Sequence, residues 1–206
     1  MTNTNIYTEI REIKKYAIDN KVPIMVDDGI DFLTTFIIKH QIKSVLEIGT
    51  GSGCISVALK KEKEDLEITA TDISIGALKI AKKNAKLNKC KITFIKQDVN
   101  KCKLFNNYDV LISNPPYLKE TDVLDEKTRF EPHNALFGGK DGLKFYPVIF
   151  GVAKKYLNKK FLIALEIDED NGKEIKALAK EAFPKAKVKL EKDLTGRDRY
   201  IFVINE

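Results

Sequence analysis

The sequence has few of the residues that build disulfide frameworks or metal sites. Its three cysteines, Cys54, Cys90 and Cys102, show neither paired nor metal-ligand spacing, and only two histidines, His40 and His133, are present. An odd number of cysteines without a secretory signal favours reduced thiols and a cytoplasmic protein. A histidine-based metal site is also unexpected, because such sites need several ligands, so we expect no metal.

Long hydrophobic segments are missing as well. No apolar run approaches the roughly 18 residues that cross a membrane, so we expect no membrane partner. Residues 1–11 lack the apolar centre of a secretory signal. The length of 206 residues suits one compact α/β domain. The net charge of +6 leaves two interpretations open, an acidic partner such as nucleic acid and an ordinary lysine-rich solvated surface.

Strand-like and helix-like apolar patterns alternate along the chain. Strands are expected at 44–49, 66–71, 91–97, 108–113, 161–167, 186–191 and 200–204, and helices at 5–20, 28–40, 54–60, 74–87, 143–156 and 172–183. Alternation of this kind predicts a doubly wound, mostly parallel α/β sheet, here of seven strands. The last two strands must be antiparallel, because their connection is too short for a parallel crossover. The arrangement resembles the Rossmann-like fold of class I methyltransferases, with a short helical N-terminal extension at 1–40 and the catalytic domain at 41–206.

A glycine-rich turn follows the first predicted strand. Glycines at alternate positions let such a turn tighten and let its backbone approach a ligand. An acid just before the first glycine, at two residues' distance, suits a cationic amino-acid ligand better than a pyrophosphate, which favours S-adenosylmethionine over a dinucleotide. The candidate cofactor residues here are Glu47, Gly49, Thr50, Gly51, Ser52 and Gly53.

Two aspartates end the next two strands. Asp72 follows the glycine turn at the distance expected of a carboxylate that accepts from both ribose hydroxyls. Asp98 is placed to accept from an adenine amino group, and Ile73 and Val99 are apolar neighbours that could flank the ring. The alternative is that both aspartates only cap a helix or turn.

The tetrapeptide Asn114-Pro115-Pro116-Tyr117 follows a buried strand directly. The side-chain oxygen of Asn114 and the carbonyl of Pro115 are two acceptors that could hold the hydrogens of a planar NH₂ group. The prolines stiffen the loop, and Tyr117 offers a flat face for stacking. This pattern predicts methyl transfer to a planar nitrogen, with Asn114, Pro115 and Tyr117 as catalytic residues and all four in contact with substrate. The alternative is a proline-rich turn with a packed tyrosine.

Three further segments resemble the HemK/PrmC family, the glutamine methyltransferases of peptide-chain release factors. Residues 131–146 look like that family's "EP..AL.GG.DGL.FY" stretch. Residues 165–167 with Gly172 are similar to its "EIG..QG" segment, and residues 193–199 to its closing "DL.G.DR" turn.

The resemblance implies an enzyme that uses S-adenosylmethionine to methylate the glutamine of a Gly-Gly-Gln loop in a release factor. The family's cofactor positions correspond to residues 49–53, Asp72, Asp98 and Asn114, and its substrate contacts to residues 114–117. The chain departs from the family at Val99, where many members have an aromatic residue. Because the tetrapeptide also occurs in other enzymes, methylation of adenine or guanine amino groups in tRNA, rRNA or DNA stays open, as does cofactor binding without catalysis. Residues 131–142 are expected to face the substrate, since long irregular segments in compact domains are often functional.

Overall fold

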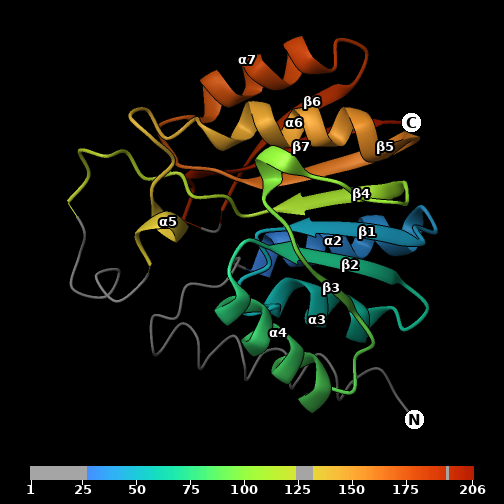
Figure 1. The fold of residues 1–206 in the computed structure, drawn as a ribbon. Coiled ribbons are helices and arrows are strands. Elements are labelled where there is room, and N and C mark those ends of the chain that lie inside the picture. Colours follow the sequence, from blue (N-terminus) through green and yellow to red (C-terminus); the bar gives the residue numbers. More distant parts are fainter. Residues whose placement is uncertain (1–26, 124–131, 194) are drawn as a thin grey trace.

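The computed structural model describes residues 27–123, 132–193 and 195–206 of the chain. They form a seven-stranded sheet in the order β3-β2-β1-β4-β5-β7-β6 (Figure 1). Only β7 runs antiparallel to its neighbours, and the other neighbouring pairs are parallel, which confirms the predicted fold class. The strands are β1 (Ser44–Ile48), β2 (Glu67–Asp72), β3 (Thr93–Lys96), β4 (Tyr108–Ser113), β5 (Leu157–Glu166), β6 (Lys187–Lys192) and β7 (Asp198–Asn205).

Helices cover both faces of this sheet. One buried cluster joins α6 and α7 to one face, and a second joins α2 and α3 to the other. Helix α4 packs beside α3 against β2 and β3, at the far end of the molecule from α7 (Figure 1). The central strands are therefore apolar on both sides, as expected in parallel sheets. The helices are α2 (Asp27–Lys39), α3 (Cys54–Glu62), α4 (Ile75–Leu87), the 3₁₀ helix η1 (Val99–Lys101), α5 (His133–Leu136), α6 (Phe145–Tyr156) and α7 (Gly172–Ala182).

Helix α2 lies within the predicted N-terminal extension and packs on the sheet. Leu33 and Ile37 are fully buried there, and the ring centroids of Phe32 and Phe202 are 4.0 Å apart. Residues 27–39 thus share the hydrophobic core of the following domain. The helix expected at 5–20 lies outside the described residues, and the division of the chain at residue 40 stays a prediction.

Two boundaries in the second half of the chain differ from the prediction. Strand β5 begins at Leu157, before the predicted residue 161. Residues 158–160 are polar, so the sequence shows no strand pattern there. This part of the strand is held next to β4 by a hydrogen bond from Asn158 Nδ2 to Asp109 Oδ1, at 2.7 Å. The segment 118–142, expected to be irregular throughout, contains the short helix α5.

Within the described part of the chain, none of the helices has the length and apolar character needed to cross a bilayer.

Candidate active site

The candidate residues gather where the carboxyl ends of β1 and β4 meet. Between these strands the sheet order reverses, because the chain winds outward from β1 in one direction and from β4 in the other. Ser113 Oγ at the end of β4 donates to the carbonyl of Ile48 at the end of β1, at 2.8 Å. Ligands of open α/β sheets bind at such a crevice.

The glycine turn after β1 is fixed to the end of β2. The N–H groups of Gly49 and Thr50 both donate to the carbonyl of Thr71, each at 2.9 Å. Gly53 has φ of 80°, and a Cβ on it would lie 3.0 Å from that of Ala81 in α4. Glycine at position 53 thus permits both the left-handed backbone and the close approach of α4.

Glu47 lies beneath this turn. Its side chain is 2% exposed, and its carboxylate accepts hydrogen bonds from the hydroxyls of Thr50, at 2.7 Å, and Ser56. Burial raises the pKa of Glu47 to about 7, against the lowering effect of the two hydroxyls. Its Oε2 is engaged with the turn itself, so that Glu47 supports the loop that would hold the ligand, and the direct contact with a cationic ligand that we expected stays a prediction.

Asp72 and Asp98 each combine the two interpretations that the sequence left open. Asp72 Oδ2 accepts from the N–H of Gly51 at 2.9 Å, and its Oδ1 accepts from that of Ser74 at 2.8 Å. Asp98 Oδ1 accepts from the backbone and side-chain N–H groups of Asn100, both at 2.9 Å, and the backbone bond lowers the pKa of Asp98 most. Each carboxylate oxygen offers two lone pairs, so capping bonds leave acceptor capacity for a ligand.

Apolar surface lies beside these carboxylates. Ile73 follows Asp72 and is 53% exposed, and Val99 follows Asp98 and is half-buried. Ile38, Ile75 and Ile80 are equally exposed, so the exposure of Ile73 alone does not mark a site, but its place between Asp72 and Ser74 leaves an apolar surface that an aromatic ring could contact.

The tetrapeptide after β4 adjoins the glycine turn. Asn114 is exposed, whereas Pro115 is buried and Tyr117 half-buried. A Cβ on Gly49 would lie 4.0 Å from the carbonyl oxygen of Asn114. The turn that could hold a cofactor and the loop that could hold a substrate therefore lie close together.

Glycines from the segment after α5 support the backbone of this loop. The N–H of Leu118 donates to the carbonyl of Leu136 at 2.9 Å, and that of Gly138 donates back to Leu118 at 2.8 Å. A Cβ on Gly138 would lie 2.5 Å from the carbonyl oxygen of Pro116, and one on Gly142 would fall on that of Tyr117. The sequence predicted that residues 131–142 face a substrate. Glu131 lies outside the described residues, and the described part contacts the backbone of the substrate loop, so its place beside a substrate stays a prediction.

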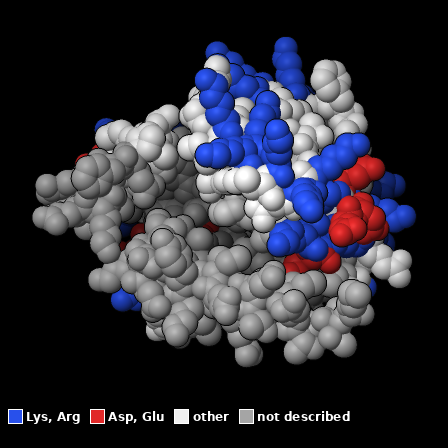
Figure 2. Space-filling model, turned by 90° about the horizontal axis from the view of Figure 1, so that it is seen from below, with Lys and Arg blue, Asp and Glu red and all other residues white. Residues whose placement is uncertain are grey.

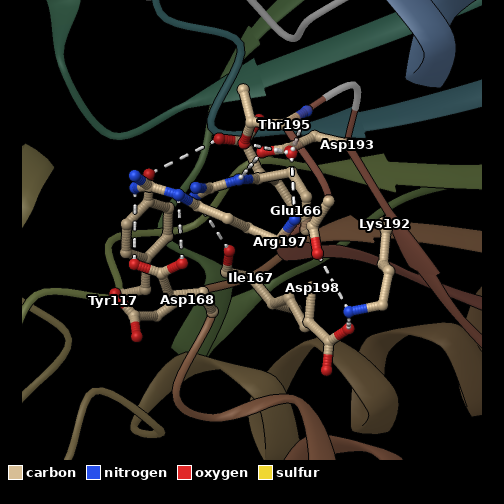
Figure 3. A network of polar contacts seen from close by, with 12 residues as sticks. Tyr117, Glu166, Ile167, Asp168, Lys192, Asp193, Thr195, Arg197 and Asp198 are labelled. Atoms are coloured by element: carbon tan, nitrogen blue, oxygen red, sulfur yellow. Dashed lines mark hydrogen bonds and ion pairs between the residues drawn. The ribbon is translucent and has the colours of Figure 1, made fainter.

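Tyr117 also contacts a buried acid to which the sequence had assigned no role. Its hydroxyl donates to Glu166 Oε1 at the end of β5, at 3.4 Å (Figure 3). The Tyr146 hydroxyl donates to the Glu166 carbonyl at 3.1 Å. Glu166 is 9% exposed, and among the described residues its Oε2 has no hydrogen-bond partner. Burial raises the pKa of Glu166 to about 7, while the nearby Arg199 acts in the opposite direction. The "EI" pair of residues 166 and 167 in the quoted motif is the signal that could have identified it.

The turn between β6 and β7 closes this network. Arg199 Nε lies 3.3 Å from Asp193 Oδ2, and its Nη1 donates to the carbonyl of Ile167 at 3.3 Å. The hydroxyl and N–H of Thr195 donate to Asp193 Oδ1 (Figure 3). The motif at residues 193–199 thus holds the Arg199 guanidinium near the carboxylate of Glu166.

Comparisons with known proteins agree with this arrangement. A family model described as "Methyltransferase small domain" matches residues 23–130. The release factor glutamine methyltransferase of Bacillus cereus is 38% identical over 163 residues, which cover 77% of this chain and 58% of that protein. The release factor glutamine methyltransferase of Lactococcus lactis is 33% identical over 202 residues, which cover 96% of this chain and 74% of that protein. The chain thus spans little more than half the length of the first of these relatives.

Solved structures show the same fold at lower identity. The O-methyltransferase from Bacillus cereus, solved in complex with SAH, has a TM-score of 0.64 and 14% sequence identity, over 100% of this chain and 93% of that chain. At this identity the likeness concerns the fold alone.

Proposed function

The chain belongs to the release factor glutamine methyltransferase family, and we propose that it transfers a methyl group from S-adenosylmethionine to the side-chain amide of a glutamine in a peptide-chain release factor. The observation that carries the proposal is that the glycine turn after β1 and the loop that begins at the exposed Asn114 lie beside each other at the ends of neighbouring strands. This arrangement would bring a methyl donor on one loop to an amide nitrogen on the other. The unpaired cysteines are consistent with a cytoplasmic location, where we expect the enzyme to act.

The residues at the strand ends fit this cofactor. The left-handed glycines leave room for close backbone approach, Asp72 can accept from ribose hydroxyls and Asp98 from the adenine amino group. The exposed Ile73 offers the adenine an apolar surface. When bound, S-adenosylmethionine supplies a methyl group on a positively charged sulfur, which is already an activated leaving group.

The contribution of the protein is alignment of the substrate. An amide nitrogen is a poor nucleophile because its lone pair is delocalised. We expect Asn114 Oδ1 and the carbonyl of Pro115 to accept its two hydrogens, which points the nitrogen at the methyl carbon. The bound S-adenosylmethionine would supply the methyl group to this nitrogen and would keep the electron pair of the broken carbon–sulfur bond. The nitrogen then releases one proton to water, and the ring of Tyr117 stacks on the planar amide.

The test uses cofactor carrying a labelled methyl group. The protein should label a release factor and should fail on the same factor with the glutamine of its Gly-Gly-Gln loop changed to alanine. Asn114→Ala should reduce turnover by about 10²-fold or more and leave cofactor affinity within a few fold, because it removes a contact made by the reacting nitrogen.

Asn88→Ala is the matched control, since Asn88 is also exposed but lies at the far end of α4. Labelling that persists on the changed factor would contradict the proposed substrate. Labelling of tRNA or rRNA in its place would favour a nucleobase amino group, and a normal kcat for Asn114→Ala would remove Asn114 from the mechanism.

A further inference from the structure

The positive charge of the protein is concentrated in one segment. Residues 73–107 contain nine lysines and a single acid, Asp98, in a chain whose net charge is +6. This segment therefore carries more positive charge than the whole chain, and the other residues together are slightly acidic. The segment comprises α4, the edge strand β3 and η1.

Helix α4 presents this charge on its outward side. Its buried positions are Leu78, Ala81 and Ala85. The lysines follow at spacings of three and four, which align side chains in a row along a helix. We name this row, with the lysine that follows the helix, the α4 basic surface: Lys79, Lys82, Lys83, Lys86 and Lys89, all exposed. Figure 2 views the molecule from the side on which α4 lies and shows Lys and Arg side chains gathered there.

Two ordinary explanations do not account for this surface. Lysines on edge strands prevent sheets from pairing edge to edge, but these lysines lie on a helix. Solvated helices commonly mix charges, as α7 does, where Lys173, Lys176 and Lys180 alternate with Glu174 and Glu181. Helix α4 has no acidic residue, and within the described residues its lysines form no ion pair.

We propose that the α4 basic surface binds the phosphate backbone of RNA. Lysine is depleted in protein–protein interfaces relative to other surface, so a row of lysines suits phosphates better than a protein partner. Residues 73–107 contain no arginine, which predicts contacts to the backbone without sequence readout. The helix begins at Ile75, three residues after Asp72, so the Lys79 end of the α4 basic surface lies nearer the candidate active site than the Lys89 end. The α4 basic surface contains none of the proposed site residues.

Binding is tested on the whole protein with a fluorescently labelled, mixed-sequence RNA about 20 nucleotides long, followed by anisotropy from roughly 50 to 200 mM salt. Wild-type protein should bind at low salt with an affinity that falls steeply as salt rises. Each phosphate-contacting lysine adds about 0.7 to the slope of log K against log salt on a single strand. Lys82→Glu/Lys86→Glu should therefore lower the slope by about 1.4 and weaken binding by about tenfold or more.

Lys173→Glu/Lys180→Glu on α7 is the matched control, since it makes the same change in net charge on exposed positions of a helix at the other end of the sheet. It should change the affinity by less than about threefold. Equal losses in both variants, or no RNA binding at low salt, would overturn the proposal. Binding to release factor that needs Lys82 and Lys86 while RNA does not bind would instead make this a protein-docking surface. The readout requires no methyl transfer, so failure here and failure of the proposed function are separate results.

Discussion

Replacement of Glu166 by glutamine should change how the stability of the protein depends on pH. Burial raises the pKa of Glu166 from 4.5 to about 7, which corresponds to about 3 kcal/mol of free energy. Because the folded state favours the neutral acid, this contribution to stability is complete below pH 4.5 and is lost as the pH rises to about 7. Glutamine resembles the neutral acid in shape and does not titrate.

The two proteins should therefore have similar stability near pH 5, and Glu166→Gln should become more stable than wild type, by up to about 3 kcal/mol, near pH 8. Arg199 is not left without a partner in the variant, because Asp193 stays 3.3 Å away. The Tyr117 hydroxyl can still donate to the amide oxygen.

Urea unfolding followed by circular dichroism at pH 5, 6, 7 and 8 measures this difference. Glu47, whose pKa is also raised to about 7, is present in both proteins, so its effect cancels. Glu174→Gln, at an exposed position of α7, is the control for the change of a glutamate to glutamine. A constant offset between Glu166→Gln and wild type from pH 5 to 8 would refute the reasoning.

Three other substitutions test the site at separate points. Gly142→Ala should lower kcat and reduce the free energy of unfolding by more than about 2 kcal/mol, because φ is 76° and the new Cβ meets the Tyr117 carbonyl. Gly151→Ala, in open space within helix α6, should leave kcat unchanged and should not reduce the free energy of unfolding. Gly53→Ala should reduce cofactor affinity, measured by calorimetry, by displacing α4 from the turn. Asp72→Asn should weaken cofactor binding about tenfold or more, and unchanged affinity would leave Asp72 with only its capping role.

Those parts of the fold that depend on local pattern could be predicted from the sequence. The alternation of apolar segments predicted the sheet and its antiparallel last pair. The glycine turn, Asp72, Asp98 and Asn114 could be placed near one another because the carboxyl ends of parallel strands share one edge of a sheet. The start of β5 could not be predicted, because residues 158–160 are polar and show no strand pattern. A side-chain contact between Asn158 and Asp109 holds this part next to β4, and the two residues are distant in the sequence.

The direction of the Glu47 side chain could not be predicted from the sequence for a different reason. Its position before the first glycine is visible in the sequence, but a carboxylate there can point toward a ligand or under the turn. The hydroxyls of Thr50 and Ser56 decide between these, since both donate to the buried carboxylate. Unpaired buried carboxylates are costly, so two hydroxyl donors stabilise the inward position.

The position of Tyr117 depends on two segments that are distant in the sequence. Gly142 leaves room for the carbonyl of Tyr117, and Glu166 accepts from its hydroxyl across a separation of 49 residues. Glycine at position 142 permits the position of the Tyr117 backbone, and the hydrogen bond to Glu166 holds the hydroxyl end of its side chain. Each contact alone has an ordinary structural explanation. A stacking surface for a planar amide needs both, and this requirement connects two motifs that were recognised only as separate resemblances in the sequence.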